Sequence, residues 1–481
     1  MYEKIIIIFL LFISATFSQQ SITWQRLYNG PQSRDDEGYA ICNSDSNNFY
    51  IGGMTRFTSS PTFRPYIIKI NPYGDTIWTK VILINGTAGG WVYALLPTQD
   101  GGCIVTGEAN LKFLIRIDRN GSVVWQYTYS GLVIYYDIKR ANNGDFICTG
   151  FYQSGGTALR IDTLGNVKWD KLYPNNFFHT LQTTVDNGCL VVGYTGVDQA
   201  IVIKLDSSGN VTNTKIFNIN NQQTHATSFE KDNSNNYILS GNYWNGTKDV
   251  PYFIKLDFNL NPLDTHIFTQ IKSEIAHSMK TLSNGKYVWT FYYETFPPDS
   301  SFNRFLITDE NGNILHQKIK YNKAFEEFVD IKPVNNGDII FVGTAEYSSN
   351  PTAFNDIFTI RSDSLLNFPS NVIGIKIVNS SLPHDYRLYQ NYPNPFNPQT
   401  TIRYDIPAPF TSGTHVTLVI YDILGKEVKT LVNEYKKTGR YTAEFDGSNL
   451  ASGVYFYKIS VHQAGSSTGN YVETKKMVLI K

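Results

Sequence analysis

The sequence predicts an all-β protein: a seven-bladed β-propeller followed by a small C-terminal β-sandwich. Three observations predict it, namely a segment that recurs along most of the chain, Asn-Gly and Asp-Gly turns between short apolar strands, and a change of character near Tyr386. The composition agrees, because Tyr (32) and Phe (30) are abundant while Met (4) is scarce. Aromatic residues favour strands, and Gly and Asn favour the turns that join them.

The chain begins with the pattern of a signal peptide. Residues 1–18 hold one lysine, an apolar run from Ile5 to Ile13 and then small residues. The run is too short to cross a bilayer core of about 30 Å as a permanent helix. No later stretch reaches the roughly 18 apolar residues that a spanning helix needs. We therefore expect export without a transmembrane anchor, and no Cys follows the run to carry a lipid.

Charge and cysteine content narrow the function classes further. Lys plus Arg (41) equals Asp plus Glu (41), so no net field attracts nucleic acid, and we predict none as a partner. The cysteines of an exported chain can form disulfides. Here they occupy equivalent or nearby positions of different repeats, too far apart for the Cα separation of about 5.5–6 Å that a disulfide prefers. We expect buried thiols, with disulfides as the alternative, at Cys42, Cys103, Cys148 and Cys189.

One segment of the sequence recurs seven times. Most copies have a basic residue, an apolar residue and a turn with Gly, and three end in Trp, as in RIDTLGNVKW at 160–169. The steps between copies are 44 to 54 residues, a period typical of propellers and other repeat architectures. The copies begin at residues 69, 116, 160, 204, 255, 307 and 361.

Each repeat is expected to form four antiparallel strands, which make one propeller blade. Ahead of most copies lies an Asn-Gly or Asp-Gly turn and an apolar strand that ends in Gly, such as NGDFICTG at 143–150, with another strand before the turn. The strand around Trp24 has no blade before it, and the last copy ends at Asn367 without a fourth strand. We predict that the Trp24 strand completes the seventh blade and closes the ring. Packing between blades is expected for Trp24, Trp78, Trp125 and Trp169.

The turn-plus-Trp segment resembles two propeller motifs, the Asp-box of sialidase-like proteins and the tryptophan-docking repeat of quinone-dependent dehydrogenases. The spacing departs from both. The Asp-box places Asp, Gly and Trp closer together than Asp118, Gly121 and Trp125, and the tryptophan-docking repeat has one more residue between Asp and Gly. The resemblance therefore implies a propeller and neither chemistry.

The character of the chain changes near Tyr386. Prolines crowd into residues 386–407, and three later segments alternate apolar and polar residues as the strands of a small β-sandwich do. These segments are 416–431, 439–459 and 473–481. We therefore place the propeller at 19–367, a linker at 368–385 and the sandwich at 386–481.

Four runs in this last part carry a family resemblance: NYPNPFNP (391–398), YDILGKEV (421–428), LASGVYFYKI (450–459) and KKMVLIK (475–481). Here the chain resembles the type A C-terminal sorting domain of the type IX secretion system, found in Bacteroidota and their relatives. The resemblance implies passage through an outer-membrane translocon, removal of the domain by a sortase-type peptidase, and a mature protein that is secreted or held on the outer cell surface. It assigns the sorting signal to Asn391, Pro393, Pro395, Asn397, Gly425, Gly453, Lys475 and Lys476.

Two interpretations of this domain accompany the resemblance. Strand alternation alone also fits an ordinary fibronectin-like accessory module, and the NYPNPFNP run favours the sorting domain. We further expect the terminal run 475–481 to form a strand with an open edge, which a secretion receptor reads by strand pairing.

No motif for metal, phosphate or nucleophile chemistry occurs in the chain, because HExxH, CxxC, P-loop and GxSxG patterns are all absent. We therefore predict no cofactor and a non-catalytic protein. Aligning the repeats on their closing Gly gives one column of the innermost strands that contains two carboxylates, Asp137 and Asp330. They are weak candidates for holding a cation across the channel, and carboxylates with local hydrogen bonds are the other interpretation.

The ends of the innermost strands and the long loops beside them predict a ligand site. Carboxylates lie at the strand entries, and aromatic residues occur in the long loops of blades five, six, seven and one. Rings beside carboxylates suit a glycan or a protein ligand. The alternative is a glycan hydrolase, although Glu326 and Glu327 cannot straddle one bond because adjacent strand residues point to opposite faces. The candidate residues are Asp36, Glu37, Phe57, Trp91, His225, Tyr243, Trp244, Glu274, Tyr292, Tyr293, Glu326 and Tyr347.

Overall fold

The computed structural model divides the chain into two compact units, Met1–Val378 and Asn379–Lys481. It describes residues 21–31, 35–45, 47–56, 63–85, 89–131, 133–152, 155–271, 274–294, 301–321, 326–346, 355–369, 373–375, 386–407, 414–436, 439–462 and 471–480. The predicted signal peptide lies outside these ranges. Over the ranges given, both units consist of strands and turns. In the described part of the chain, no helix is long and apolar enough to cross a membrane.

The N-terminal unit is a series of antiparallel sheets, each built mainly of four strands. A short pairing of β10 with β7 joins two of the sheets. The strands of the first sheets are β2 (Asp36–Asn43), β3 (Phe49–Arg56), β4 (Phe63–Ile70) and β5 (Thr76–Val81); β6 (Gly90–Pro97), β7 (Cys103–Ala109), β8 (Lys112–Ile117) and β9 (Val123–Tyr129); β10 (Val133–Arg140), β11 (Phe146–Tyr152), β12 (Gly155–Ile161) and β13 (Val167–Pro174). Those of the following sheets are β14 (Asn176–Thr183), β15 (Cys189–Thr195), β16 (Ala200–Leu205) and β17 (Val211–Phe217); β18 (Thr224–Lys231), β19 (Tyr237–Trp244), β20 (Asp249–Leu256) and β21 (Pro262–Ile267); β22 (Ile275–Thr281), β23 (Tyr287–Glu294), β24 (Ser301–Thr308) and β25 (Ile314–Tyr321); and β26 (Glu326–Pro333), β27 (Ile339–Glu346) and β28 (Asn355–Ser362).

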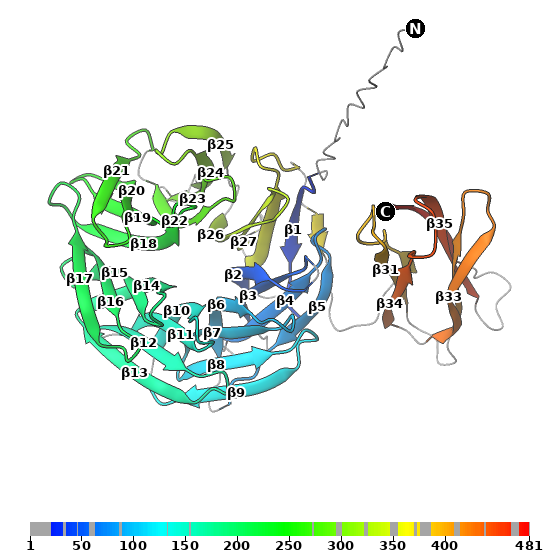
Figure 1. Cartoon of the computed structure of the whole chain (residues 1–481), viewed down its shortest axis with the longest axis horizontal. Helices are drawn as coiled ribbons and strands as arrows, with labels where there is room; N and C mark the ends of the chain where they lie inside the picture. Colours follow the sequence, from blue (N-terminus) through cyan, green and yellow to red (C-terminus); the bar gives the residue numbers. More distant parts are fainter. Residues whose placement is uncertain are drawn as a thin grey trace, which may run out of the picture. The chain divides into compact units, whose positions relative to one another are not determined.

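The first strand of each sheet lies innermost. Figure 1 shows these strands arranged around the centre of the unit. Each contacts the next in cyclic order, and the last contacts the first: β2, β6, β10, β14, β18, β22 and β26. Four-stranded sheets arranged radially about an axis are the architecture of a β-propeller.

The N-terminal strand completes the last of these sheets. β1 (Trp24–Tyr28) pairs antiparallel with β28 and places Trp24 opposite Arg361, as Trp169 lies opposite Arg160 within a single repeat. Trp24 is buried, and its Nε1 donates to the carbonyl of Pro72 in the β2–β5 sheet at 2.9 Å. The predicted closure by the Trp24 strand is therefore confirmed. A short strand from the segment predicted as linker, β29 (Ile373–Ile375), pairs parallel with β1 on its other side.

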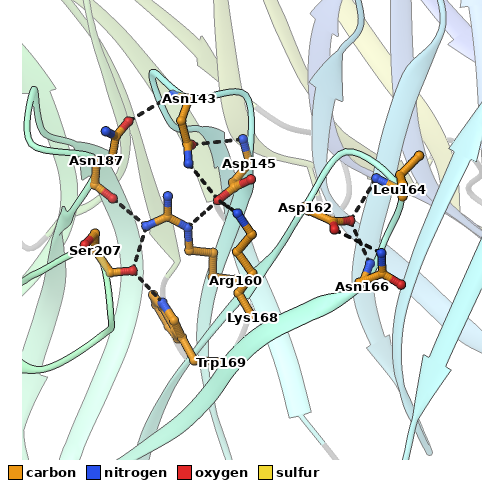
Figure 2. Close-up of polar contacts among 10 residues, drawn as sticks. All are labelled: Asn143, Asp145, Arg160, Asp162, Leu164, Asn166, Lys168, Trp169, Asn187 and Ser207. Atoms are coloured by element: carbon orange, nitrogen blue, oxygen red, sulfur yellow. Dashed lines mark hydrogen bonds and ion pairs between the residues drawn. The ribbon is translucent and has the colours of Figure 1, made fainter.

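An aspartate caps the turn in six of the recurring segments, and Asn71 does so in the first. Asp162 Oδ1 accepts from the backbone N–H groups of Leu164 and Asn166, both at 2.9 Å, and Oδ2 accepts from the Asn166 side chain (Figure 2). The bond from the Asn166 side chain, followed by the one from its backbone, holds the pKa of Asp162 below its usual value. Equivalent turns are capped by Asn71, Asp118, Asp206, Asp257, Asp309 and Asp363.

The basic residue and the Trp of the segment tie one sheet to the next. Arg160 Nε donates to Asp145 at 2.8 Å, and Nη1 donates to the carbonyls of Asn187 and Ser207 in the following sheet (Figure 2). Trp169 Nε1 donates to the same Ser207 carbonyl at 2.9 Å. The arrangement recurs at the closing seam, where Arg361 and Trp24 both donate to Pro72. The repeat in the sequence therefore encodes the junction between sheets.

The apolar core lies between neighbouring sheets. One cluster combines Tyr50 and Ile67 from β3 and β4 with Val105 and Phe113 from β7 and β8. The thiols expected to be buried and unpaired are so in the structure: Cys42, Cys103, Cys148 and Cys189. Burial raises the pKa of Cys42 and of Cys189 to about 12, which keeps both protonated.

The C-terminal unit has two antiparallel sheets that share one core. The strands are β30 (Arg387–Leu388), β31 (Gln399–Ile406), β32 (Thr414–Tyr421), β33 (Glu427–Lys436), β34 (Gly439–Asp446), β35 (Gly453–His462) and β36 (Tyr471–Leu479). One sheet has the order β33-β32-β35-β36, and the other has the order β30-β31-β34. Ile402 and Tyr404 of the smaller sheet pack in one cluster with Leu418 and Tyr457 of the larger sheet.

The edge of the terminal strand is covered, contrary to our expectation. Phe396 N–H donates to the carbonyl of Val478, and Ile480 N–H donates to the carbonyl of Phe396, both at 2.9 Å. Asn394 Oδ1 accepts from Val478 N–H, and the Gln390 side chain donates to the carbonyl of Lys476. The proline-rich run 391–398 therefore occupies the pairing groups at the end of β36. A receptor cannot add a strand there unless this run moves away.

Candidate ligand-binding site

Each innermost strand carries a β-bulge at the same point. The pairing register with the neighbouring strand shifts by one residue there, so that one residue of the inner strand has no residue opposite. In β2 the shift lies between Gly38 and Ala40 and leaves Tyr39 as the extra residue. The equivalent positions, which we call the bulge residues, are Tyr39, Tyr93, Tyr136, His179, Thr227, His277 and Val329.

The closing glycine of the repeat makes room for the bulge. A Cβ atom on Gly150 would lie 1.7 Å from the carbonyl oxygen of Ile134, and one on Gly193 would lie 1.8 Å from that of Phe177. No side chain fits at such distances. The same close approach occurs at Gly53, Gly107, Gly241 and Gly343, while β23 has Phe291 at this position.

Four of the bulge residues, which come from consecutive repeats, contact one another through their rings. The ring centroids lie 4.8 Å apart for Tyr39 and Tyr93, 5.4 Å for Tyr93 and Tyr136, and 5.3 Å for Tyr136 and His179. The row continues from His179 to Tyr194 and from Tyr194 to His225, whose rings stack at 4.2 Å. All of these rings are partly exposed. We call the row, with two rings packed against it, the aromatic arc: Tyr39, Tyr93, Tyr136, Phe151, Phe177, His179, Tyr194 and His225.

Carboxylates border the aromatic arc and bond to its polar atoms. Glu37 accepts hydrogen bonds from the Tyr39 hydroxyl and from the side chain of Asn355. Glu108 accepts from the Tyr93 hydroxyl at 3.4 Å. Asp198 lies 2.9 Å from His225 Nε2. A fourth carboxylate, Glu327, lies 3.2 Å from Nε2 of the bulge residue His277.

Burial decides the protonation of two bulge residues. Desolvation, reinforced by the neighbouring His225, lowers the pKa of His179 to about 4. Desolvation also lowers the pKa of His277 to about 4. Both imidazoles are therefore neutral at pH 7. Burial raises the pKa of Tyr136 to about 12, so its ring remains a phenol.

The two carboxylates considered as cation ligands join neighbouring sheets instead. Asp137 Oδ2 accepts from the Thr180 hydroxyl at 2.8 Å and from the Leu181 N–H at 3.0 Å. Asp330 Oδ2 accepts from the N–H of Ile41 at 3.0 Å, across the closing seam. Among the residues that the structure describes, no group of three or more His, Cys, Asp or Glu could hold a metal ion. The geometry favours the locally hydrogen-bonded interpretation of both carboxylates.

The structure brings some of the predicted ligand residues to the aromatic arc. Glu37 borders the arc and His225 belongs to it. Trp91 lies on β6, two residues before the bulge residue Tyr93. The Trp91 ring lies 4.9 Å from Phe63. Tyr293 packs instead on Phe302 at 4.9 Å. Trp244 is 38% exposed at the end of β19. Two predicted loop residues, Phe57 and Tyr347, and the side chain of Glu326 lie outside the described part of the chain.

Other predicted ligand residues are buried and contact protein groups. Asp36 is fully buried and accepts from the N–H of Gly30, and burial raises its pKa to about 7. Glu274 is fully buried and pairs with Arg304 at 2.9 Å. Each of these two residues lies three positions before a bulge residue, next to a residue that borders the arc. Because side chains alternate along a strand, both point to the opposite face, into the protein. Tyr243 and Tyr292 are each 7% exposed, so neither presents a ring for stacking on a ligand.

Sequence reasoning missed the bulge residues, which form half of the aromatic arc. Strict alternation assigns Tyr39 and Ala40 to opposite faces of the strand. The aligned repeats have mostly small residues at the position of Ala40, and this gave no reason to expect rings at the position before it. A bulge breaks that alternation. Two sequence features could have indicated the bulge residues. The residue before the Ala40 position is Tyr or His in most repeats, and the closing glycine lies on the neighbouring strand.

The predicted sorting residues lie in the proline-rich run, in one turn and on the last two strands of the C-terminal unit. Asn391 is buried and donates to Thr400 and to the carbonyl of Pro393, while Pro393, Pro395 and Asn397 are exposed. Gly425 adopts φ 80° in a turn capped by Asp422. The residues that remain are Gly453 at the start of β35, Lys475, which pairs with Glu473 at 3.0 Å, and Lys476, whose carbonyl accepts from Gln390.

Residues 390–479 match the secretion system C-terminal sorting domain family. This part of the chain is therefore a C-terminal sorting domain, as the resemblance to the type IX domain implied. Such a domain implies export to the cell surface or beyond it. A sequence search among curated proteins found no match.

Several solved structures are similar over most of their own length. The propeller of Dos1 aligns over 73% of this chain and 98% of that chain, with 9% identity and a TM-score of 0.44. Sqt1 from Chaetomium thermophilum aligns over 70% of this chain and 87% of its own, with 11% identity and a TM-score of 0.43. A protein of unknown function from Bacteroides caccae aligns over 60% of this chain and 94% of its own, with 12% identity and a TM-score of 0.39. The fold assignment rests on the strand pairing described above and not on these similarities.

Proposed function

We propose that this chain is a secreted or surface-bound binding protein, a seven-bladed β-propeller that holds a ligand at the aromatic arc without catalysis. In this proposal the signal peptide at 1–18 leads the chain to the periplasm. A C-terminal β-sandwich then takes it through the type IX translocon, where a sortase-type peptidase removes the sorting domain. The ligand is a glycan or an exposed segment of another protein.

The observation that carries the proposal is the contact between partly exposed rings of consecutive innermost strands. Tyr39, Tyr93, Tyr136 and His179 come from separate sheets, yet each ring touches the next. A folded protein usually buries its aromatic rings, and a contiguous row left partly exposed indicates a surface for binding. Because rings stack on sugar rings and on apolar side chains alike, the arc suits either ligand.

The bordering carboxylates add hydrogen-bond acceptors to these stacking surfaces. Glu37, Glu108 and Asp198 each bond to a polar atom of the arc, which fixes the orientation of both partners. Preorganised polar groups around an apolar platform are typical of specific binding sites. The alternative function is a glycan-active hydrolase. In that case the same three carboxylates would be the candidate catalytic acids.

A binding screen of residues 19–481, which keep both units, tests the proposal. The labelled protein is applied to an array of glycans and peptides beside the double variant Tyr93→Ala/Tyr136→Ala, with Tyr435→Ala in the C-terminal unit as a control. We expect wild type and Tyr435→Ala to bind one class of ligand, and the double variant to lose that binding. Binding that survives in the double variant, or no binding by any form, would reject the arc as the site. Release of reducing sugar from a bound glycan would favour the hydrolase.

Export is tested separately in the host cell. We expect a chain that ends at residue 385 to remain in the periplasm and the complete chain to reach the surface or the medium, as cell fractionation would detect. Equal surface display of both chains would contradict the sorting role of the C-terminal unit.

A further inference from the structure

We propose that the ligand of the aromatic arc carries an alkylammonium group, which the arc binds by cation–π contact and by pairing with Glu37 and Glu108. This inference rests on the function proposed above and narrows its ligand to one chemical class. It follows from the charge of the arc, the electronic state of its rings and the neutrality of His179.

The arc and its border have an excess of negative charge. We define the arc and its border by three sets of residues. The first is the bulge residues, and the second is the residues two positions earlier on the same innermost strands. The third is the residues of the neighbouring strands that pair with the second set. Together these sets contain Glu37, Glu108 and Glu327, and within these described positions neither Lys nor Arg occurs. Charge complementarity therefore favours a cation over an anion.

Hydrogen bonding increases the attraction of the rings for a cation. The hydroxyls of Tyr39 and Tyr93 donate to Glu37 and Glu108. A phenol that donates to a carboxylate gains electron density in its ring, and the face of an aromatic ring attracts a cation more strongly as that density rises. Burial, and after it the neighbouring carboxylate, raises the pKa of both hydroxyls, so each keeps its proton and the bond persists.

His179 adds no positive charge that would repel such a ligand, because burial lowers its pKa and leaves it neutral at pH 7. The other histidine of the arc, His225, lies beside a carboxylate, with Nε2 2.9 Å from Asp198. A ring surface bordered by carboxylates matches the requirements of an ammonium group: a polarisable face for its methylene or methyl groups and an anion for its charge.

Paired probes that differ only in charge test the inference on residues 19–481, which keep both units. Choline is compared with 3,3-dimethylbutan-1-ol, which has the same shape without the charge, and Nα-acetyl-lysine amide is compared with Nα-acetyl-norleucine amide. We expect at least one ammonium probe to bind about tenfold or more tightly than its neutral counterpart in calorimetric titration. Preference for choline indicates a small-molecule ligand, and preference for the lysine probe indicates a protein ligand.

Variants locate the binding. Tyr93→Leu removes a ring and Glu37→Gln removes a charge, and each is expected to weaken binding of the ammonium probe roughly 2- to 30-fold. Tyr93→Phe keeps the ring and loses only the bond to Glu108, so we expect a smaller loss. Tyr435→Leu, at an exposed ring in the C-terminal unit, is expected to bind as wild type. Circular dichroism confirms that each variant is folded.

The outcomes separate this inference from the proposed function. Equal binding of charged and neutral probes, or an unchanged affinity in Glu37→Gln, would overturn the inference. A neutral glycan that binds and is lost in Tyr93→Leu, without binding of either ammonium probe, would overturn it and leave the proposed function standing. No binding of any probe or array ligand would reject both.

Discussion

At the scale of single residues, the junction between sheets depends on one buried guanidinium. Arg160 is 2% exposed and bonds to a carboxylate of its own sheet and to two carbonyls of the next. Burial raises the pKa of Asp145, but the bonds from Lys168, Asn143 and Arg160 outweigh it, and the pKa lies below its usual value. The pair is therefore charged in the folded protein, and its partners are fixed.

Removing this guanidinium is expected to be costly. Arg160→Leu leaves Asp145 buried beside one partly exposed lysine, and we predict a loss of about 3–5 kcal/mol in the free energy of unfolding. Arg116→Leu is the matched control, because Arg116 pairs with Asp100 at 2.9 Å with side chains 30% and 44% exposed. Its predicted loss is below about 1 kcal/mol. Urea denaturation followed by tryptophan fluorescence measures both, and equal losses would contradict the assigned role of Arg160.

The largely desolvated imidazole of His179 predicts a pH dependence of stability. Its pKa is about 4 in the folded protein, while the usual value is 6.5. The unfolded chain therefore binds more protons than the folded chain below pH 6.5, and this residue lowers stability as the pH falls from 6.5 towards 4. We predict that His179→Gln removes roughly 1–3 kcal/mol of this acid destabilisation. Denaturation of both forms at several pH values measures it, and parallel curves would show that the imidazole is not buried as described.

At the scale of elements, a glycine and a bulge determine where the innermost strands place their side chains. The repeat was predictable from sequence because the capped turn, the basic residue and the Trp keep their spacing. The completion of the last sheet by the Trp24 strand also followed from that spacing. The bulge was not predictable from alternation, since one extra residue shifts every later side chain of the strand. Phe291 shows further that the glycine is not obligatory in every sheet.

Two neighbouring glycines test the role of the bulge. Gly193→Ala would place a Cβ 1.8 Å from the Phe177 carbonyl oxygen, and we predict a loss of about 1–3 kcal/mol in the free energy of unfolding. Gly196→Ala, three residues later, meets nothing closer than 3.6 Å and has no strained φ, so we predict a change within about 0.5 kcal/mol. Thermal and chemical denaturation compare them. A tolerated alanine at 193 would mean that the strands can separate there.

At the scale of the whole molecule, the ends of the propeller unit hold the ring of sheets together. β1 supplies Trp24 and Tyr28, which donate to Pro72 and Gly74 in the β2–β5 sheet. Asp330 adds a bond to Ile41 across the same seam. The closure therefore consists of hydrogen bonds and packing between the first and last parts of the unit.

Deletion of β1 tests the importance of this closure. A chain without residues 19–30 loses two buried rings and exposes β28 as an open edge, which favours aggregation. We predict a lower melting temperature and aggregates in size-exclusion chromatography, whereas a chain without residues 1–18 should be monodisperse. An unchanged melting temperature after deletion of 19–30 would show that the ring does not depend on the N-terminal strand.

The whole molecule also shows where prediction from sequence stopped. The sorting domain was recognisable from short runs such as NYPNPFNP, and the family match confirms it. Glu37, which borders the aromatic arc, was among the candidate site residues predicted from sequence. Asp36 and Glu274 were not distinguishable from it until strand alternation around the bulge was known. The rings of the aromatic arc come from separate repeats, and only the closed ring of sheets brings them together.

The most direct test of the aromatic arc as a binding site is radical footprinting of residues 19–481 with and without a ligand that the array or the paired probes identify. We expect the ligand to protect Tyr39, Tyr93 and Tyr136 from oxidation and to leave the exposed rings of Trp244 and Tyr435 as reactive as before. Protection confined to other parts of the chain, or none at saturating ligand, would contradict the aromatic arc as the binding site.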